Sequence, residues 1–166
     1  MTVVILGVDP GNSCGLAELT DGRLTFISQE TPEVMLQQLR ERLGHAFIMY
    51  STADLKLTVV CERFIQRNIP GVHMTNQPKA LEVAGAAEDV CRHVAVEFVL
   101  QNPADAKAIA PNDRLRQLGL WVTPSQLGKS DVNDARDAIR HAVLRLATKH
   151  ATILDRLLRD AGGQIS

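Results

Sequence analysis

Two acidic residues in this chain of 166 residues directly follow apolar runs that are typical of buried strands. Asp9 follows the run 2–8 and precedes a Pro-Gly pair that stops a strand, and Glu62 follows the run 57–61. Because open α/β sheets place their sites at the carboxyl ends of strands, we expect both carboxylates at one edge of a sheet. A buried carboxylate is costly unless it is paired or binds a metal. The alternative for Asp9 is that it only organises its own turn.

A third group of acids recurs every three residues on an expected helix over 131–148. This spacing puts Asp131, Asp134 and Asp137 on adjacent positions of the helix surface. Asp131 and Asp134 suit the first turn of a helix, where a cap or the helix dipole favours acids. Asp137 lies beyond that turn, where Asp is a poor helix former, and it lies far from the centre of the apolar stripe. It therefore faces either water or the sheet.

If the helix turns Asp134 and Asp137 toward Asp9 and Glu62, four carboxylates converge on one place. Their mutual repulsion would raise their pKa values unless cations neutralise them. Oxygen ligands favour Mg²⁺, or Mn²⁺ in its place, over zinc. Two such ions about 4 Å apart suit in-line displacement at phosphorus. If the acids converge in this way, they form a site that holds two divalent ions and cuts a phosphate ester.

The elements that must position these acids are typical of a mixed α/β sheet. A hairpin signal at 20–22 joins two of three opening strands, and later strands alternate with helices as parallel crossovers do. We expect one domain over 1–150, with 151–166 as its C-terminal helix and tail. The expected strands cover 2–8, 14–19, 23–28, 57–61 and 94–100. The first expected helix begins at Thr31. The other helices are expected over 75–93, 104–118 in one or two pieces, 131–148 and 151–159.

Composition narrows the class of protein. Hydrophobic residues make up 45% and charged residues 22%, no run of 18 apolar residues occurs, and the N-terminus does not resemble a signal peptide. We expect no membrane role and a cytoplasmic location, with the three cysteines as reduced core thiols. The net charge of −1 combines −4 over residues 1–100 with +3 over residues 101–166. Such a balance does not exclude nucleic acid, because acidic metal ligands mask basic surface.

At three places the sequence resembles the RuvC-type Holliday junction resolvases, particularly their compact phage-encoded members. The motifs are Gly-Val-Asp-Pro-Gly at 7–11, Val-Val-Cys-Glu-Arg-Phe at 59–64 and Asp-Ala-Arg-Asp-Ala at 134–138. The resemblance covers about residues 3–147. It implies an RNase H-like fold with a five-stranded sheet of order 3-2-1-4-5, in which strand 2 is antiparallel. It also implies a Mg²⁺-dependent homodimeric endonuclease that cuts branched DNA and leaves 5′-phosphate and 3′-hydroxyl ends.

The resemblance assigns the metal ligands and the catalytic role to Asp9, Glu62, Asp134 and Asp137. The Asp-x-x-Asp-Ala spacing also fits one turn earlier, so the helical pair could instead be Asp131 and Asp134. The ions would be Mg²⁺ or Mn²⁺, two in each site.

DNA contacts are expected around this site. Phe64, two residues after Glu62, either stacks on unpaired bases or is a core side chain. His141, one turn after Asp137, could assist proton transfer, although a surface histidine without a catalytic role is favoured. Five basic residues are candidate phosphate contacts, and an ordinary solvated charge is the favoured alternative for each: Arg63, Arg67, Lys107, Arg114 and Lys129.

Two other classes of protein share part of this pattern. Sugar kinases and actin-like ATPases also carry a strand, an aspartate and a glycine turn, but they need two such domains and a second phosphate loop. A non-catalytic RNase H-like module would bind nucleic acid without cutting it. The presence of acids at all three motifs argues against that module.

Overall fold

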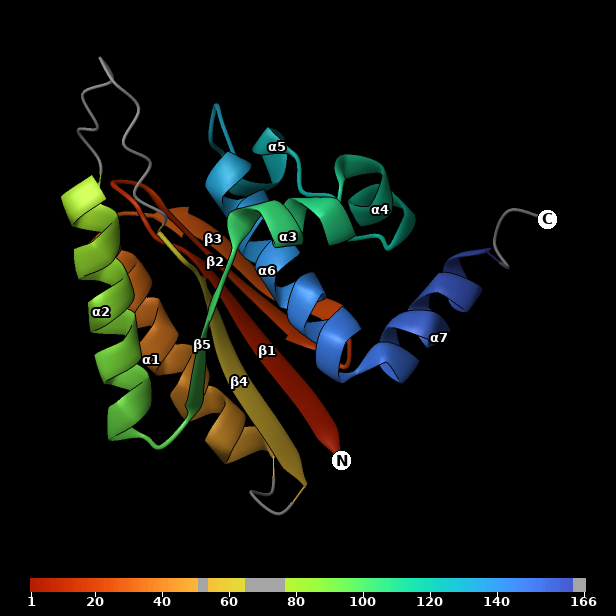
Figure 1. Ribbon diagram of the computed structural model, residues 1–166, viewed down its shortest axis with the longest axis horizontal. Coiled ribbons are helices and arrows are strands. Elements are labelled where there is room, and N and C mark those ends of the chain that lie inside the picture. Colours follow the sequence, from red (N-terminus) through yellow and green to blue (C-terminus); the bar gives the residue numbers. More distant parts are fainter. Residues whose placement is uncertain (51–53, 65–76, 163–166) are drawn as a thin grey trace.

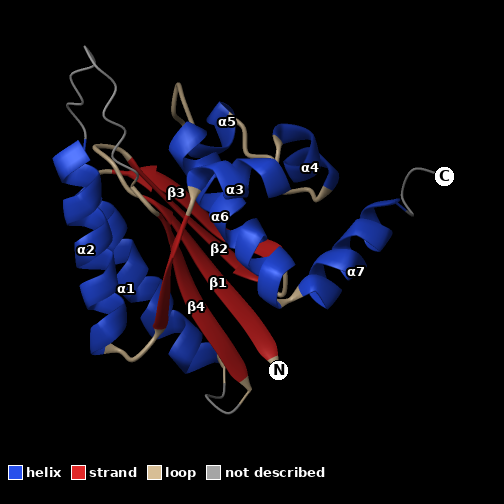
Figure 2. Ribbon diagram, viewed as in Figure 1, coloured by secondary structure: helices blue, strands red, loops and turns tan. Residues whose placement is uncertain are grey.

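A mixed five-stranded sheet forms the centre of the protein (Figures 1 and 2). The structure, a computed structural model, describes residues 1–50, 54–64 and 77–162. The strands are β1 (Thr2–Asp9), β2 (Cys14–Thr20), β3 (Arg23–Glu30), β4 (Leu55–Glu62) and β5 (Glu97–Gln101). Their order is β3-β2-β1-β4-β5, with β2 antiparallel to both neighbours and β4 and β5 parallel to β1. The predicted strand order and the antiparallel second strand are confirmed.

Helices cover both faces of the sheet (Figure 1). One face packs against α1 (Pro32–Met49) and α2 (Gln77–His93), and the other packs mainly against α6 (Asn133–Lys149). Around α6 lie α3 (Pro103–Ile109), α4 (Asn112–Gln117), α5 (Pro124–Leu127) and α7 (Ala151–Gly162). Each face has its own hydrophobic core, so the sheet is the middle layer of three.

The two-residue period of β1 decides which face carries chemistry. Val3 and Ile5 belong to the core under α6, whereas Leu6 and Val8 belong to the core under α1 and α2. Successive side chains of a strand point to opposite faces, so Asp9 lies on the α6 face. Glu62 lies on the same face, because Val60, two residues earlier on β4, packs in the core under α6.

Two glycines let α6 approach this face closely. A Cβ atom on Gly7 would lie 2.0 Å from the carbonyl oxygen of Ala138, and one on Gly15 would lie 2.0 Å from that of Asp134. Gly15 is the strand partner of Asp9, and Gly7 lies two residues before it. The main chain of α6 therefore rests directly on β1 and β2, beside Asp9.

The observed elements differ from the expected ones mainly at their ends. The fifth strand begins at Glu97 rather than at residue 94, because Ala95 takes a positive φ of 55° in the turn before it. The helix α5 was not expected. Asp21 and Gly22 form the predicted hairpin turn with positive φ, and the three cysteines are buried as expected. Within the described ranges, no helix is both long and apolar enough to cross a membrane.

Candidate metal centre

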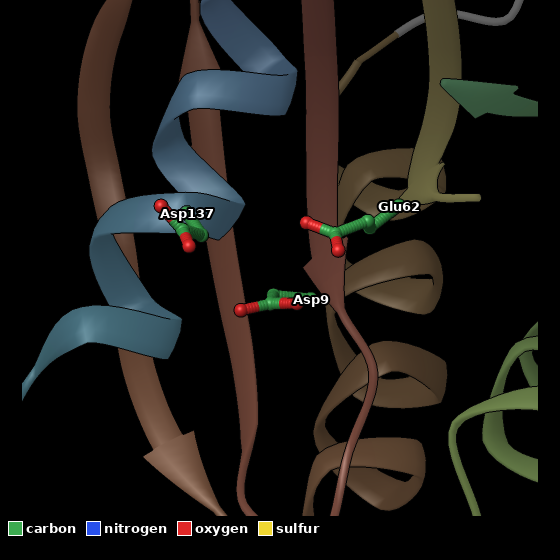
Figure 3. A group of neighbouring side chains, drawn as sticks. All are labelled: Asp9, Glu62 and Asp137. Carbon is green, nitrogen blue, oxygen red and sulfur yellow. The ribbon is translucent and has the colours of Figure 1, made fainter. Parts of the chain in front are cut away.

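Three of the four predicted acids meet at the end of β1 (Figure 3). Asp9 ends β1, Glu62 ends the parallel neighbour β4, and Asp137 lies in the second turn of α6. Each offers a carboxylate oxygen, and these three oxygens lie within 4.8 Å of one another. Such a group of oxygen atoms matches the donors that Mg²⁺ and Mn²⁺ take in proteins.

The surroundings of Asp9 disfavour the charged form of its carboxylate. Burial raises its pKa well above the ordinary value of 3.8, and the charges of Glu62, Asp137 and Asp134 raise it further. Lys107 lowers the pKa in part. Bringing a divalent cation to this place would relieve both the repulsion and part of the desolvation, so the residues present fit a metal ion.

Asp134 lies at the rim of the group. Its pKa is raised by burial, and Asp131, Asp137 and Glu62 add to this, while a hydrogen bond with the side chain of Ser13 opposes it. Asp134 is therefore close enough to share the electrostatic field of the other acids without belonging to the cluster within 4.8 Å. A metal ion that took a further ligand at this rim would find it in the carboxylate of Asp134.

Asp131, the alternative to Asp137, has a different role in the structure. It is exposed, and its Oδ1 accepts a hydrogen bond of 3.1 Å from the amide of Asn133, so it organises the start of α6. Asp137 instead lies on the sheet side, with 18% of its side chain exposed. The geometry therefore favours Asp137 over Asp131 as the partner of Asp9.

Two basic residues hold the Asp137 carboxylate. Arg140 donates to Oδ1, and the Nζ of Lys107 lies 3.2 Å from Oδ2. Arg140 also donates to the carbonyl oxygen of Ala110, over 3.2 Å, and to the side chain of Asn112. The segment from α3 to α4 is thus tied through Arg140 to the carboxylate that faces Asp9.

Glu62 has a partner that the sequence analysis placed wrongly. His141 was favoured as a surface residue, but it is 1% exposed and its Nε2 lies 3.1 Å from Glu62 Oε2. Its Nδ1 lies 3.0 Å from Oε1 of Gln101. The helix puts His141 one turn beyond Asp137 on the side that packs against β4 and β5, where its ring fills space between two polar side chains. The prediction of a surface histidine is wrong.

A groove of about 670 Å³ opens beside Asp137. Its basic members are Lys107, Arg136 and Arg140. Arg136 donates to the carbonyl oxygen of Val122 over 2.9 Å and stacks on the ring of Trp121, with its Cζ 3.8 Å from the ring centroid. Lys107 is one of the predicted phosphate contacts, whereas neither arginine was predicted to lie here, although their spacing of four on α6 places them on one side of that helix. The other lining residues are Pro111, Asn112, Asp113 and Asn133.

The remaining candidates for DNA contact lie around the site to different degrees. Arg63 follows Glu62 and is exposed, while Phe64 is half-buried and belongs to neither core formed by the described residues. Lys129 pairs with Glu30 over 3.2 Å. Arg114 is half-buried on α4 and is not among the residues that line the groove, and Arg67 lies outside the described residues.

The fold matches solved structures of RuvC. RuvC from Thermus thermophilus in complex with a Holliday junction substrate is similar with a TM-score of 0.59 and 14% identity, over 93% of this chain and 96% of that one. A second Thermus thermophilus RuvC structure gives 0.56 and 15%, over 92% and 98%. No protein-family model matches the sequence, and no curated protein gives a significant match. The chain therefore has the RuvC fold, with its RNase H-like sheet, as the sequence resemblance implied.

Proposed function

We propose that this protein, on its RuvC fold, is a metal-dependent endonuclease that cuts Holliday junctions or other branched DNA. The observation that carries the proposal is the convergence of Asp9, Glu62 and Asp137 from two strands and a distant helix. Three acids separated by as much as 128 residues in the chain have no structural need to meet, and their repulsion disfavours the metal-free fold. A bound cation turns that repulsion into attraction.

The metal ligands in this proposal are Asp9, Glu62 and Asp137, with Asp134 joining them from the rim. Two Mg²⁺ ions, or Mn²⁺ in their place, would supply an activated water and would neutralise charge on the phosphate that is cut. The protein side chains do the rest of the work. Asp9 offers its carboxylate between the other two, Glu62 is held by His141, and Asp137 is held by Arg140. The expected products carry 5′-phosphate and 3′-hydroxyl ends.

The groove beside Asp137 is the proposed path of the DNA backbone next to the metal site. Lys107 is the most accessible cation in it, with 58% of its side chain exposed, and it lies between the solvent and Asp137. Arg136 and Arg140 are already bonded to protein groups and act as fixed positive charges. Phosphate contacts of this kind position a strand without reading its sequence.

Residues around Glu62 are proposed to meet the branch point. Arg63 and Arg67 would contact phosphates, and the partly exposed ring of Phe64 would stack on an unpaired base, a contact worth about 1–3 kcal/mol. Arg114 and Lys129 are proposed to contact phosphates farther from the metals. These contacts would select a branched over a linear duplex, since only a branch offers splayed bases close to backbone.

A homodimer is part of the proposal, because symmetric cutting of a four-way junction needs two sites that act together. We propose that residues 1–150 form the nuclease domain and that 151–166 complete the same domain. In support of this, Ile153, Leu154 and Leu157 of α7 pack against the core under α6. The three buried free cysteines fit the reducing cytoplasm of a bacterial or phage-infected cell.

The test is cleavage of a synthetic four-way junction and of a linear duplex of the same sequence in Mg²⁺. The wild-type protein should cut the junction, and Asp9→Asn should abolish cutting while it leaves junction binding intact. Asp155→Asn, an exposed acid on α7, is the matched control and should cut normally. Equal cutting of both substrates would refute selectivity for branches. Binding without any cutting in Mg²⁺ or Mn²⁺ would favour the non-catalytic module.

A further inference from the structure

Glu62 lies beside two buried polar side chains, those of His141 and Gln101, and neither belongs to a hydrophobic core of the described residues. Glu62 and Gln101 are direct partners in the parallel ladder of β4 and β5, so their side chains leave the sheet on the same face. His141 reaches down from α6 and lies between them, 3.1 Å from the carboxylate and 3.0 Å from the amide oxygen. Gln101 is 9% exposed and His141 is 1% exposed. The three groups form one chain of contacts that leads from the interior to the acidic cluster.

The direction of these hydrogen bonds follows from the chemistry of the groups. A carboxylate oxygen accepts hydrogen bonds, so in the tautomer that carries its proton on Nε2 the ring of His141 donates to Oε2 of Glu62. Gln101 carries both an acceptor and a donor and can satisfy Nδ1 of the ring in either role. The backbone oxygen of Gln101 also accepts a bond of 2.6 Å from the amide of Arg63, which fixes the chain directly after Glu62.

We propose that His141 and Gln101 are positioning residues that hold the Glu62 carboxylate in the orientation in which it binds metal. The inference rests on the proposed role of Glu62 as a ligand. With Oε2 bound by the imidazole, the carboxylate cannot turn away from Asp9, and its remaining acceptor positions face the acidic cluster. Partners of this kind raise metal affinity because the ligand loses less rotational freedom on binding.

A structural alternative is that His141 only fills the core between α6 and the sheet. The same two elements offer a matched control one helical turn away. Arg145 lies four residues after His141 on α6 and pairs with Glu97, which lies four residues before Gln101 on β5. Arg145 is also buried, and it touches none of the acids at the metal site. Removal of the Arg145 side chain should lower the stability of the protein and leave the orientation of the Glu62 carboxylate unchanged.

The experiment measures Mn²⁺ binding by isothermal titration calorimetry, with no DNA present, and unfolding temperatures in a chelator. His141→Leu should weaken Mn²⁺ binding by about 10–100-fold, the range found when the partner of a metal ligand is removed. His141→Gln, whose amide can donate to Glu62, should recover most of that loss. Arg145→Met should bind Mn²⁺ as the wild-type protein does, whatever its unfolding temperature.

Several results separate this inference from the nuclease proposal. If His141→Leu and Arg145→Met bind Mn²⁺ equally well, the positioning role is refuted. If His141→Leu does not fold, Gln101→Leu makes the same comparison, and unchanged Mn²⁺ binding in that variant overturns the inference. A wild-type protein that binds Mn²⁺ with this dependence yet cuts no junction supports the positioning role and refutes the nuclease. A wild-type protein that binds no Mn²⁺ refutes both.

Discussion

Replacing Asp9 with asparagine should stabilise the metal-free protein while it removes the response to metal. The carboxylate of Asp9 is partly buried, and burial and three acidic neighbours raise its pKa well above 3.8. A group whose pKa is raised on folding binds more protons in the folded state than in the unfolded state. Stability is then lost as the pH rises from the ordinary value of 3.8 through the folded value. An asparagine carries no charge and avoids that loss.

The size of the effect follows from the distance between the charges. Two unit charges 4.8 Å apart repel by about 3.5 kcal/mol at an effective dielectric constant of 20 and about 0.9 kcal/mol at 80. Arg140 and Lys107 offset the charge of Asp137, and His141 contacts Glu62, so we expect a net gain of about 1–3 kcal/mol. For a protein of this length that corresponds to about 2–12 °C in the unfolding temperature.

Bound metal offsets the advantage of the asparagine variant. An ion at 100 times its dissociation constant stabilises the folded state by about 2.7 kcal/mol, or about 5–10 °C here. The wild-type protein should gain this in Mn²⁺, and Asp9→Asn should gain little. The assay is thermal unfolding followed by circular dichroism, from pH 4 to pH 8 in chelator and at pH 8 in Mn²⁺. In chelator the advantage of Asp9→Asn over the wild-type protein should grow as the pH rises above 3.8.

Two results would refute this reasoning. The first is an Asp9→Asn variant that unfolds below the wild-type protein in chelator, since the repulsion would then be absent from the native state. The second is an equal gain of both proteins in Mn²⁺, since Asp9 would then not contribute to metal binding. Asp155→Asn removes one exposed acid and should leave both measurements unchanged.

Three further predictions concern the surroundings of the site. Lys107→Met removes the cation 3.2 Å from Asp137, so calorimetry should show Mn²⁺ binding about 2–5-fold tighter and fluorescence anisotropy should show weaker junction binding. Gly15→Ala forces a Cβ into the first turn of α6 and should lower stability in urea by at least about 1–3 kcal/mol, whereas Gly44→Ala, with open space around it, should be neutral or stabilising. The pKa of the Cys61 thiol is raised well above 9.0 by burial, so mass spectrometry should find it unalkylated at pH 8 until the protein unfolds.

The fold and the strand acids were accessible from the sequence because each rests on a strong local signal. An apolar run that ends in Asp9 or Glu62 marks both the strand and its end, and the side-chain period of two then fixes the face. The Asp137 carboxylate was harder to place. Its position on the helix left water and sheet both open, and the answer depends on where α6 lies over the strands.

The parts that the sequence analysis missed depend on contacts between distant segments. His141 reads as an ordinary polar residue until β4 and β5 bring Glu62 and Gln101 to the same place. Arg136 and Arg140 read as solvated charges, whereas Trp121 and the loop before α4 bind them. Periodicity within α6 cannot reveal these partners, because none of them belongs to that helix.

The glycine contact under α6 has a consequence for how such a protein can change its sequence. Main chain rests on main chain at Gly7 and Gly15, so the height of the helix above the sheet does not depend on the size of core side chains. Apolar residues elsewhere in the core can be exchanged and repacked while the distance between the helical and strand carboxylates stays the same. The geometry of the acidic cluster is thereby uncoupled from the bulk of the interior, which fits a fold shared at only 14% identity. The positions that must remain glycine are Gly7 and Gly15.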